Sequence, residues 1–239
     1  MMNDNCFLSL NNLCNVMTYV TSTTKPKLFN TLNLKKSMNT KLKILAASDL
    51  HGDAKQVKKL ARKAEKEDVD LVVLCGDLTG WTETKNIIKP FKDKDKRVLI
   101  IPGNWDSFAT ADFLANIYGV RNIHGYAVQY EKIGFFGAGG AEAPGPGTIS
   151  EKELFDTLKK AHSGLKGIEK KIMVTHEHPQ GSKSEFSGIP GSKAITKAIK
   201  QFKPDLLLHG HIHEAAGIED KIDGTKVINV GKEGKIIDI

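Results

Sequence analysis

The chain has 239 residues, of which 40% are hydrophobic and 26% are charged, a composition that fits one folded domain and excludes disorder throughout. Its formal charge is +7, but residues 1–40 contribute +3 of it, because they hold four lysines against the single acid Asp4. The remaining +4 is interleaved with acids, which argues against a nucleic-acid surface, and no apolar run reaches the roughly 18 residues of a membrane span.

Residues 1–40 are expected to be a disordered leader, or an overextended start, before a domain that covers residues 41–239. They contain many asparagines and no arginine, and they show no sustained periodicity. Asparagines break the apolar segment at 6–20, and no basic region precedes it, so we do not expect a signal peptide. The three cysteines lack paired spacing, which indicates a reducing compartment and predicts a cytoplasmic protein.

From residue 41 the chain alternates between predicted strands and helices. Continuous apolar runs predict buried strands, and apolar residues at helical spacing predict the helices between them. Asp53 is placed as the N-cap of the first helix. The expected elements of this half are a strand at 43–47, a helix at 54–66, a strand at 69–75, a helix at 82–92 and a strand at 97–101.

The second half predicts shorter strands and two further helices, with a Gly/Pro-rich loop at 137–147. An Asp223-Gly224 turn between β-rich runs predicts a hairpin, which a last strand follows. The other expected elements are strands at 127–130 and 132–136, a helix at 150–161, a strand at 171–175, a helix at 192–202 and a strand at 205–209. The pattern predicts an α/β protein with two sheets.

Side chains that can bind metal follow five of the predicted strands. They are Asp49, His51, Asp77, Asn104, His176, His211 and His213. Loops at the carboxyl ends of strands converge in α/β sheets, so we expect these side chains to meet. This mixed nitrogen and oxygen set suits Mn, Fe, Zn or Co. Each short motif alone is weak, and the prediction depends on the ordered set.

The order of these motifs resembles that of the calcineurin-like metallophosphoesterase family. The motifs are Asp49-x-His51, Gly76-Asp77-x-x-Gly80, Gly103-Asn104-x-Asp106, Thr175-His176 and Gly210-His211-x-His213. Asn229-Val230-Gly231 is similar to the closing Asn-Pro-Gly of the family. The resemblance covers nearly everything after residue 40 and implies a four-layer α/β/β/α sandwich of two mixed sheets flanked by helices.

The resemblance also implies a centre of two divalent transition-metal ions, with Mn expected and Fe, Zn, Ni or Co as alternatives. One ion would be held by Asp49, His51 and His213, and the other by Asn104, His176 and His211. Asp77 would bridge the two ions. Such a pair clamps phosphate oxygens and lowers the pKa of a water molecule to about 7, so that hydroxide is available at neutral pH.

The third motif departs from the family at Trp105, where the family commonly has a histidine that is thought to protonate the leaving group. An indole can donate a hydrogen bond but cannot act as a general acid, so the catalytic residues stay unassigned. Trp105 is expected either to stack on an aromatic leaving group or to pack under the metal loop. His178 is expected either to supply the missing acid or to hydrogen-bond within its loop. Asp106 is expected to orient a ligand.

The sequence therefore predicts a metal-dependent phosphoric ester hydrolase, a phosphodiesterase or phosphomonoesterase that acts on a small or nucleotide-like substrate. The loop at 181–191 is a candidate substrate lid. One alternative is a nuclease of the same family, against which the missing histidine and the modest charge argue. Another is a protein-binding scaffold with little catalysis, against which the complete ligand set argues. We expect no nucleic-acid or membrane partner, and the oligomeric state is not predicted.

Overall fold

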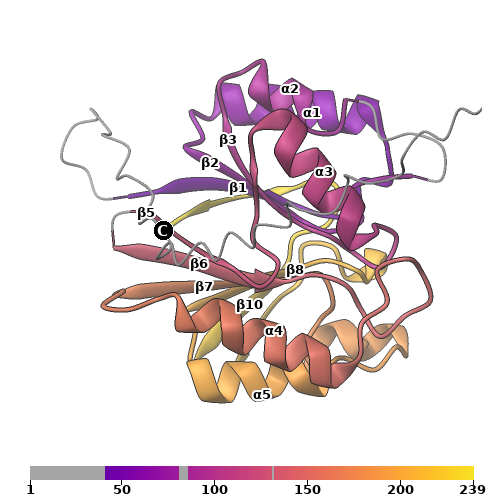
Figure 1. Ribbon diagram of the computed structural model, residues 1–239, viewed down its shortest axis with the longest axis vertical. Helices are drawn as coiled ribbons and strands as arrows, with labels where there is room; N and C mark the ends of the chain where they lie inside the picture. Colours follow the sequence, from indigo (N-terminus) through magenta and orange to yellow (C-terminus); the bar gives the residue numbers. More distant parts are fainter. Residues whose placement is uncertain (1–40, 81–85, 131) are drawn as a thin grey trace, which may run out of the picture. The chain divides into compact units, whose positions relative to one another are not determined.

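The computed structural model describes residues 41–80, 86–130 and 132–239, which belong to one compact unit (Figure 1). Two β-sheets lie face to face in this unit, and helices cover the outer face of each sheet. The α/β/β/α sandwich expected from the sequence is therefore confirmed. The prediction of a disordered or overextended leader at 1–40 lies outside the described residues.

The first sheet has the strand order β11-β1-β2-β3-β4. Its strands are β1 (Lys43–Ala47), β2 (Leu71–Cys75), β3 (Arg97–Ile101), β4 (Arg121–Asn122) and β11 (Lys235–Asp238). The first four are parallel and β11 is antiparallel to β1, so the carboxyl ends of β1, β2 and β3 lie at the same edge. The outer face is covered by α1 (Ala54–Lys66), α2 (Lys89–Lys92) and α3 (Phe108–Tyr118).

The second sheet has the strand order β5-β6-β7-β8-β10-β9 and is also mixed. Its strands are β5 (Ala127–Tyr130), β6 (Ile133–Ala138), β7 (Lys170–Thr175), β8 (Leu206–His209), β9 (Glu219–Ile222) and β10 (Thr225–Asn229). Helices α4 (Glu151–Ser163) and α5 (Lys193–Phe202) cover its outer face. Two short 3₁₀ helices, η1 (Lys183–Ser187) and η2 (His213–Ala215), lie in the loops after β7 and β8.

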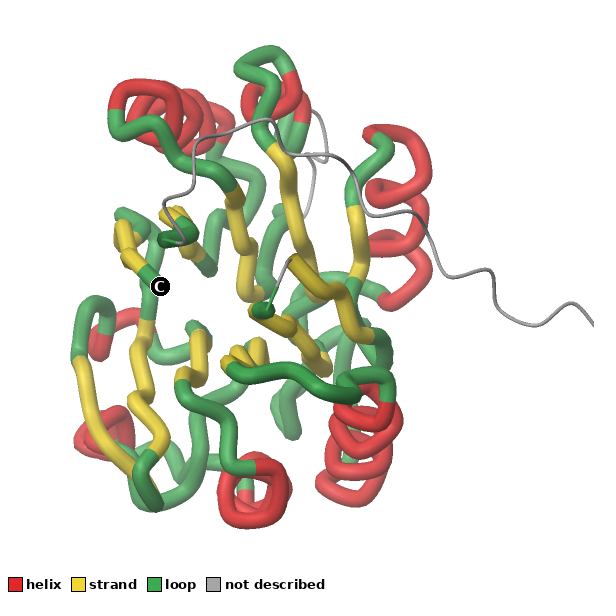
Figure 2. Tube along the Cα trace, turned by 90° about the vertical axis from the view of Figure 1, so that its left-hand side faces the viewer, coloured by secondary structure: helices red, strands yellow, loops and turns green. Residues whose placement is uncertain are grey.

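The buried positions of the central strands β1, β2 and β3 form continuous apolar runs because both faces of these strands are buried. In β1, Ile44 and Ala46 pack between the two sheets, whereas Leu45 and Ala47 pack against the outer helices. Figure 2 shows the two layers of strands between the outer helices. The side chain of Asp53 accepts hydrogen bonds from the N–H groups at the start of α1, as the sequence predicts. None of the helices in the described residues combines the length and apolar character that a membrane crossing needs.

Two helices differ from the prediction. The helix expected at 82–92 is wrong over 86–88, because α2 covers only Lys89–Lys92, and 81–85 lie outside the described residues. Pro90 stands in the first turn of α2, where a missing N–H costs nothing and a preceding helical turn would clash with its ring. The sequence does not predict α3, because Phe113 and Ile117 lie exposed on the face opposite its buried residues, so no amphipathic pattern appears.

Candidate metal centre

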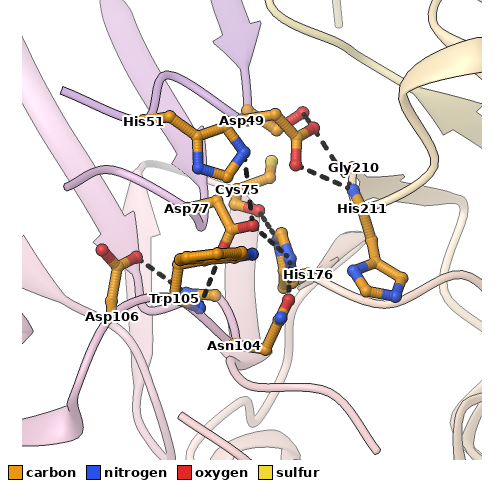
Figure 3. A network of polar contacts seen from close by, with 12 residues as sticks. Asp49, His51, Cys75, Asp77, Asn104, Trp105, Asp106, His176, Gly210 and His211 are labelled. Carbon is orange, nitrogen blue, oxygen red and sulfur yellow. Dashed lines mark hydrogen bonds and ion pairs between the residues drawn. The ribbon is translucent and has the colours of Figure 1, made fainter. Parts of the chain in front are cut away.

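The seven predicted ligands lie in the loops that leave the carboxyl ends of β1, β2, β3, β7 and β8. Three of these loops belong to the first sheet and two to the second. Figure 3 shows the loops meeting, with Asp77 between His51 and His176 and with Asp49 beside the backbone of His211. The structure therefore brings together side chains from distant parts of the sequence, such as Asp49 and His213.

One group of ligand atoms is formed by Asp49, His51 and His213, whose atoms lie within 4.8 Å of one another. The Nε2 atoms of the two histidines are 3.3 Å apart, and His213 Nε2 is 3.5 Å from Asp49 Oδ1. Two imidazole nitrogens that face each other can form one hydrogen bond at most. That bond uses the lone pair of only one of the two nitrogens. A cation between them would use both lone pairs, and the group therefore fits a metal ion.

A second group is formed by Asp49, Asp77 and His176, all of them buried. His176 Nε2 lies 3.4 Å from Asp77 Oδ2 and 3.1 Å from Asn104 Oδ1. Asp77 Oδ2 is also 3.6 Å from His51 Nε2, a member of the first group. One carboxylate thus faces ligands of both groups, and these residue groups suit a dinuclear metal site.

The ring of His176 is oriented by the backbone of β2. Its Nδ1 lies 2.9 Å from the carbonyl oxygen of Cys75, so Nδ1 donates its hydrogen there and Nε2 faces the acids. Metal-binding histidines usually have their second ring nitrogen held in this way. The sequence could not predict this contact, because the donor and acceptor come from different sheets.

Asp106 connects two loops of the site to each other instead of orienting a ligand side chain. Its carboxylate accepts hydrogen bonds from the N–H groups of Leu78, Thr79 and Gly103, each at 2.9 Å, and from the hydroxyl of Thr79 at 2.7 Å. The expectation that Asp106 orients a ligand is therefore refined: it ties the loop that carries Asp77 to the loop that carries the next predicted ligand.

Backbone strain is concentrated at the predicted ligands. Nine non-glycine residues among those described have positive φ, and four of them are Asp49, His51, Asp77 and His211, with φ between 45° and 70°. A left-handed conformation costs a residue with a side chain about 1 kcal/mol or more, and such residues cluster where function requires the geometry. The tight turns after β1, β2 and β8 are therefore stabilised by contacts elsewhere in the fold.

The ring of His211 belongs to neither group. Its backbone N–H donates to both oxygens of Asp49 at 3.2 Å, while its ring stands edge-on to His176 with the centroids 5.1 Å apart. Burial lowers the pKa of His211 to about 4, so the ring is neutral and able to bind metal at pH 7. The assignment of His211 and Asn104 to the second ion stays a prediction.

Trp105 and His178 occupy different environments. The side chain of Trp105 is 39% exposed and stands edge-on to His51, while its backbone N–H donates to Asp77 Oδ1 at 2.9 Å. His178 is fully buried, and its Nε2 lies 3.2 Å from the carbonyl oxygen of Ile189. Of the two roles expected for His178, the structure favours the hydrogen bond within its own loop, because a buried ring has no open path to a leaving group.

Three residues support the site without having been singled out from the sequence for this role. The hydroxyl of Ser48 donates to Asp49 Oδ2 at 2.5 Å, and Asn229 donates to the carbonyl oxygen of Ile212 between two predicted ligands. Glu177 is buried beside His176, and burial raises its pKa to about 7. The closing motif at Asn229 was a usable signal, whereas nothing in the sequence marks Ser48.

The acids and imidazoles of the site strongly shift one another's pKa values. Burial alone would raise the pKa of Asp49, but the hydrogen bond to His213 and the charge of His176 lower it to about 2. Burial alone would lower the pKa of His176, but the hydrogen bond to Asp77 and the charges of both acids raise it to about 9. Without metal, a protonated His176 therefore takes the place of a cation between the carboxylates.

We expect metal binding to become tighter as the pH rises from 6 to 8. The pKa of about 9 means that His176 is protonated over this range, and a metal must displace that proton, so the dissociation constant should fall about tenfold per pH unit. The interactions that raise this pKa also stabilise the metal-free fold. Their contribution is complete below the ordinary pKa of 6.5 and is lost as the pH rises through 9. Calorimetric titration with Mn²⁺ in buffers of different ionisation enthalpy counts the released protons.

In the same titration, His176→Asn should bind metal more weakly and release about one proton fewer. A dissociation constant that does not change with pH in the unaltered protein would contradict the raised pKa.

Comparisons with known proteins find one family model and several solved structures of the same fold. A family model described as calcineurin-like phosphoesterase matches residues 42–215, whereas no curated protein matches the chain. The protein TT1561 of Thermus thermophilus matches with a TM-score of 0.68 and 19% identity over 84% of this chain and 99% of that one. A dimetal phosphatase from Danio rerio matches with a TM-score of 0.53 and 14% identity over 80% of this chain and 87% of that one. The purple acid phosphatase PPD1 from yellow lupin (Lupinus luteus) seeds matches with a TM-score of 0.53 and 13% identity over 84% of this chain and 45% of that one.

Proposed function

The chain belongs to the calcineurin-like phosphoesterase family, and from that premise we propose that it hydrolyses phosphate esters, with phosphodiesters of small or nucleotide-like alcohols as substrates. The observation that carries the proposal is the position of Asp77, whose Oδ2 lies 3.6 Å from His51 Nε2 and 3.4 Å from His176 Nε2. A carboxylate that faces a histidine of each ligand group is the arrangement that a two-metal hydrolase needs.

We assign the ligands as the family resemblance implies. Asp49, His51 and His213 would hold one ion, Asn104, His176 and His211 would hold the other, and Asp77 would serve both. When bound, such ions lower the pKa of a water molecule and offset the charge on the phosphate oxygens. The chain supplies the orientation: the carbonyl of Cys75 fixes His176, and the turns with positive φ present Asp49 and Asp77 to the centre.

The surroundings of the centre favour substrates with good leaving groups. Trp105 occupies the position of the family's histidine, and an indole cannot release a proton to a departing alcohol at neutral pH. His178 is fully buried and lies within hydrogen-bond distance of the carbonyl oxygen of Ile189, which argues against it as a replacement for that histidine. The partly exposed ring of Trp105 instead offers a face on which a base or another aromatic group can stack, which supports a nucleotide-like substrate.

The proposal is tested with bis-p-nitrophenyl phosphate and p-nitrophenyl phosphate, after the protein has been loaded with Mn²⁺ and its metal content measured. We expect the diester to be turned over faster than the monoester, and a chelator to abolish both activities. Loading with Fe, Zn, Ni or Co in parallel identifies the metal that supports the highest rate. If two metal equivalents are bound and neither ester is hydrolysed, the protein is not a hydrolase of this kind.

A further inference from the structure

A pocket of about 200 Å³ lies beside the candidate metal centre. Three predicted ligands, Asp49, His51 and His213, line one part of it. The other part is lined by the segment that follows β10, which includes Lys232. A ligand bound at the metal centre can therefore extend along this pocket towards Lys232.

The backbone next to Lys232 is fixed on both sides. Its carbonyl oxygen accepts a hydrogen bond from Gln56 Nε2 at 2.8 Å, which attaches it to α1. The preceding residue, Gly231, has a φ of +58° and packs so closely that an added Cβ would lie 2.5 Å from Cβ of Ala216. Lys232 thus extends from a rigid turn, which is what a binding residue needs if it is to select one substrate geometry.

The ammonium group of Lys232 pairs with Asp53 and not with a predicted metal ligand. Its Nζ lies 2.9 Å from Asp53 Oδ2, and its side chain is 44% exposed. The other charged residue of the lining besides Asp49 is Glu233, whose Oε2 lies 2.6 Å from Lys59 Nζ. An ammonium has three hydrogens to donate, so the pair with Asp53 leaves it able to donate to an anionic oxygen in the pocket as well.

We propose that Lys232 determines specificity by binding a second phosphate of the substrate, one that is not hydrolysed. This inference rests on the function proposed above and narrows its substrate class to phosphate esters that carry a further phosphate, such as a nucleotide substituted at both the 5′ and 3′ positions. The scissile phosphate is held among the ligand groups, and Lys232 lies at the other part of the pocket. The two phosphates are thereby recognised by separate groups.

The test uses two chromogenic substrates that differ only by one phosphate: the p-nitrophenyl ester of thymidine 5′-phosphate, with and without a 3′-phosphate. For the unaltered protein we expect kcat/KM to be about fivefold higher with the 3′-phosphate, and the difference to lie in KM, because one partly exposed ion pair contributes about 1 kcal/mol. In Lys232→Ala the ratio of the two kcat/KM values should fall to about one. In Lys232→Arg, which keeps the charge, the preference should persist.

Two further variants separate binding from structure. Lys226 is also exposed and ion-paired, to Glu219, but lies near the opposite end of β10, so Lys226→Ala should keep the fivefold preference. Asp53→Asn removes the carboxylate that pairs with Lys232 and leaves an N-cap residue for α1, so it too should keep the preference. Loss of the preference in Asp53→Asn would show that Lys232 acts only through α1, and the inference would be wrong.

Binding measurements keep the inference distinct from the proposed hydrolysis. Thymidine 3′,5′-bisphosphate should bind the Mn²⁺-loaded protein about fivefold more tightly than thymidine 5′-phosphate, and Lys232→Ala should remove that difference, whether or not either ester is hydrolysed. Equal affinities in the unaltered protein overturn the inference. An equal loss of affinity for both ligands in Lys232→Ala also overturns it, because Lys232 would then contact the phosphate that the two ligands share.

Discussion

Asp77→Ala should lower kcat/KM for bis-p-nitrophenyl phosphate by at least about 10³-fold, because loss of one group that stabilises the transition state already costs 10²–10³-fold and here a shared ligand is lost. Asp77 Oδ2 faces His51 at 3.6 Å and His176 at 3.4 Å, so one substitution affects both groups. Elemental analysis of the purified variant should show less than two metal equivalents. Steady-state rates with saturating Mn²⁺ provide the second measurement.

Two variants give this prediction its controls. Asp77→Asn keeps an oxygen that can accept the hydrogen bond from the N–H of Trp105, so it separates loss of charge from loss of loop structure. Asp112→Ala removes an exposed carboxylate of α3 that accepts from Asn122 at 2.8 Å, and it should keep the rate of the unaltered protein. Retention of more than a tenth of the activity in Asp77→Ala, with full metal content, would show that the carboxylate is not shared.

The elements with both faces buried are the ones that the sequence predicts best. The run from Ile44 to Ala47 is continuously apolar because it lies between the second sheet and α1, and the predicted strand, which begins at Lys43, has the observed bounds. The first helix is equally clear, since its buried residues recur at helical spacing after the Asp53 cap. Burial on one defined face leaves a period in the sequence, and burial of both faces of a strand leaves a continuous apolar run. Helix α3, with its exposed Phe113, shows neither pattern.

The candidate site is predicted in its membership but not in its internal contacts. Parallel strands bring the residues after β1, β2 and β3 to one edge, and this rule alone collects Asp49, His51 and Asp77. It does not say which atoms face one another across the two sheets. His176 and Cys75, whose carbonyl oxygen contacts the histidine ring, are 101 residues apart in sequence. The rings of His211 and His176 lie edge-on to each other, and the spacing of the motifs does not predict this orientation.

The pocket beside the centre shows the same limit. Lys232 comes immediately after the closing motif. The sequence identifies the motif but gives no reason to single out the lysine. Its significance depends on the pocket that it lines together with Asp49 and His51, which are more than 170 residues away in sequence. A long side chain acquires a specific role only through such non-local partners, so the structure is needed to identify it.

Gly103→Ala should abolish activity almost as completely as loss of the shared carboxylate, although it removes no functional group. A Cβ at residue 103 would overlap both Oδ1 and the backbone nitrogen of Asp77, and it would lie 2.7 Å from Asp77 Cγ. The backbone there cannot yield freely, because the N–H of Gly103 donates to the buried carboxylate of Asp106 at 2.9 Å. Overpacking of this kind costs about 1–3 kcal/mol of stability, and a shift of about 1 Å in a reacting group can cost 10²-fold in rate.

The matched control is Gly164→Ala, since Gly164 also has a negative φ and its added Cβ would meet nothing closer than 3.2 Å. Thermal unfolding and hydrolysis of bis-p-nitrophenyl phosphate, measured on both variants, separate a local change from a global one. We expect Gly103→Ala to lose at least about 10²-fold in kcat while Gly164→Ala keeps the rate of the unaltered protein. If Gly103→Ala kept full activity and two metal equivalents, the carboxylate of Asp77 would not need the position that the glycine allows, and its role as the shared ligand would fail with it.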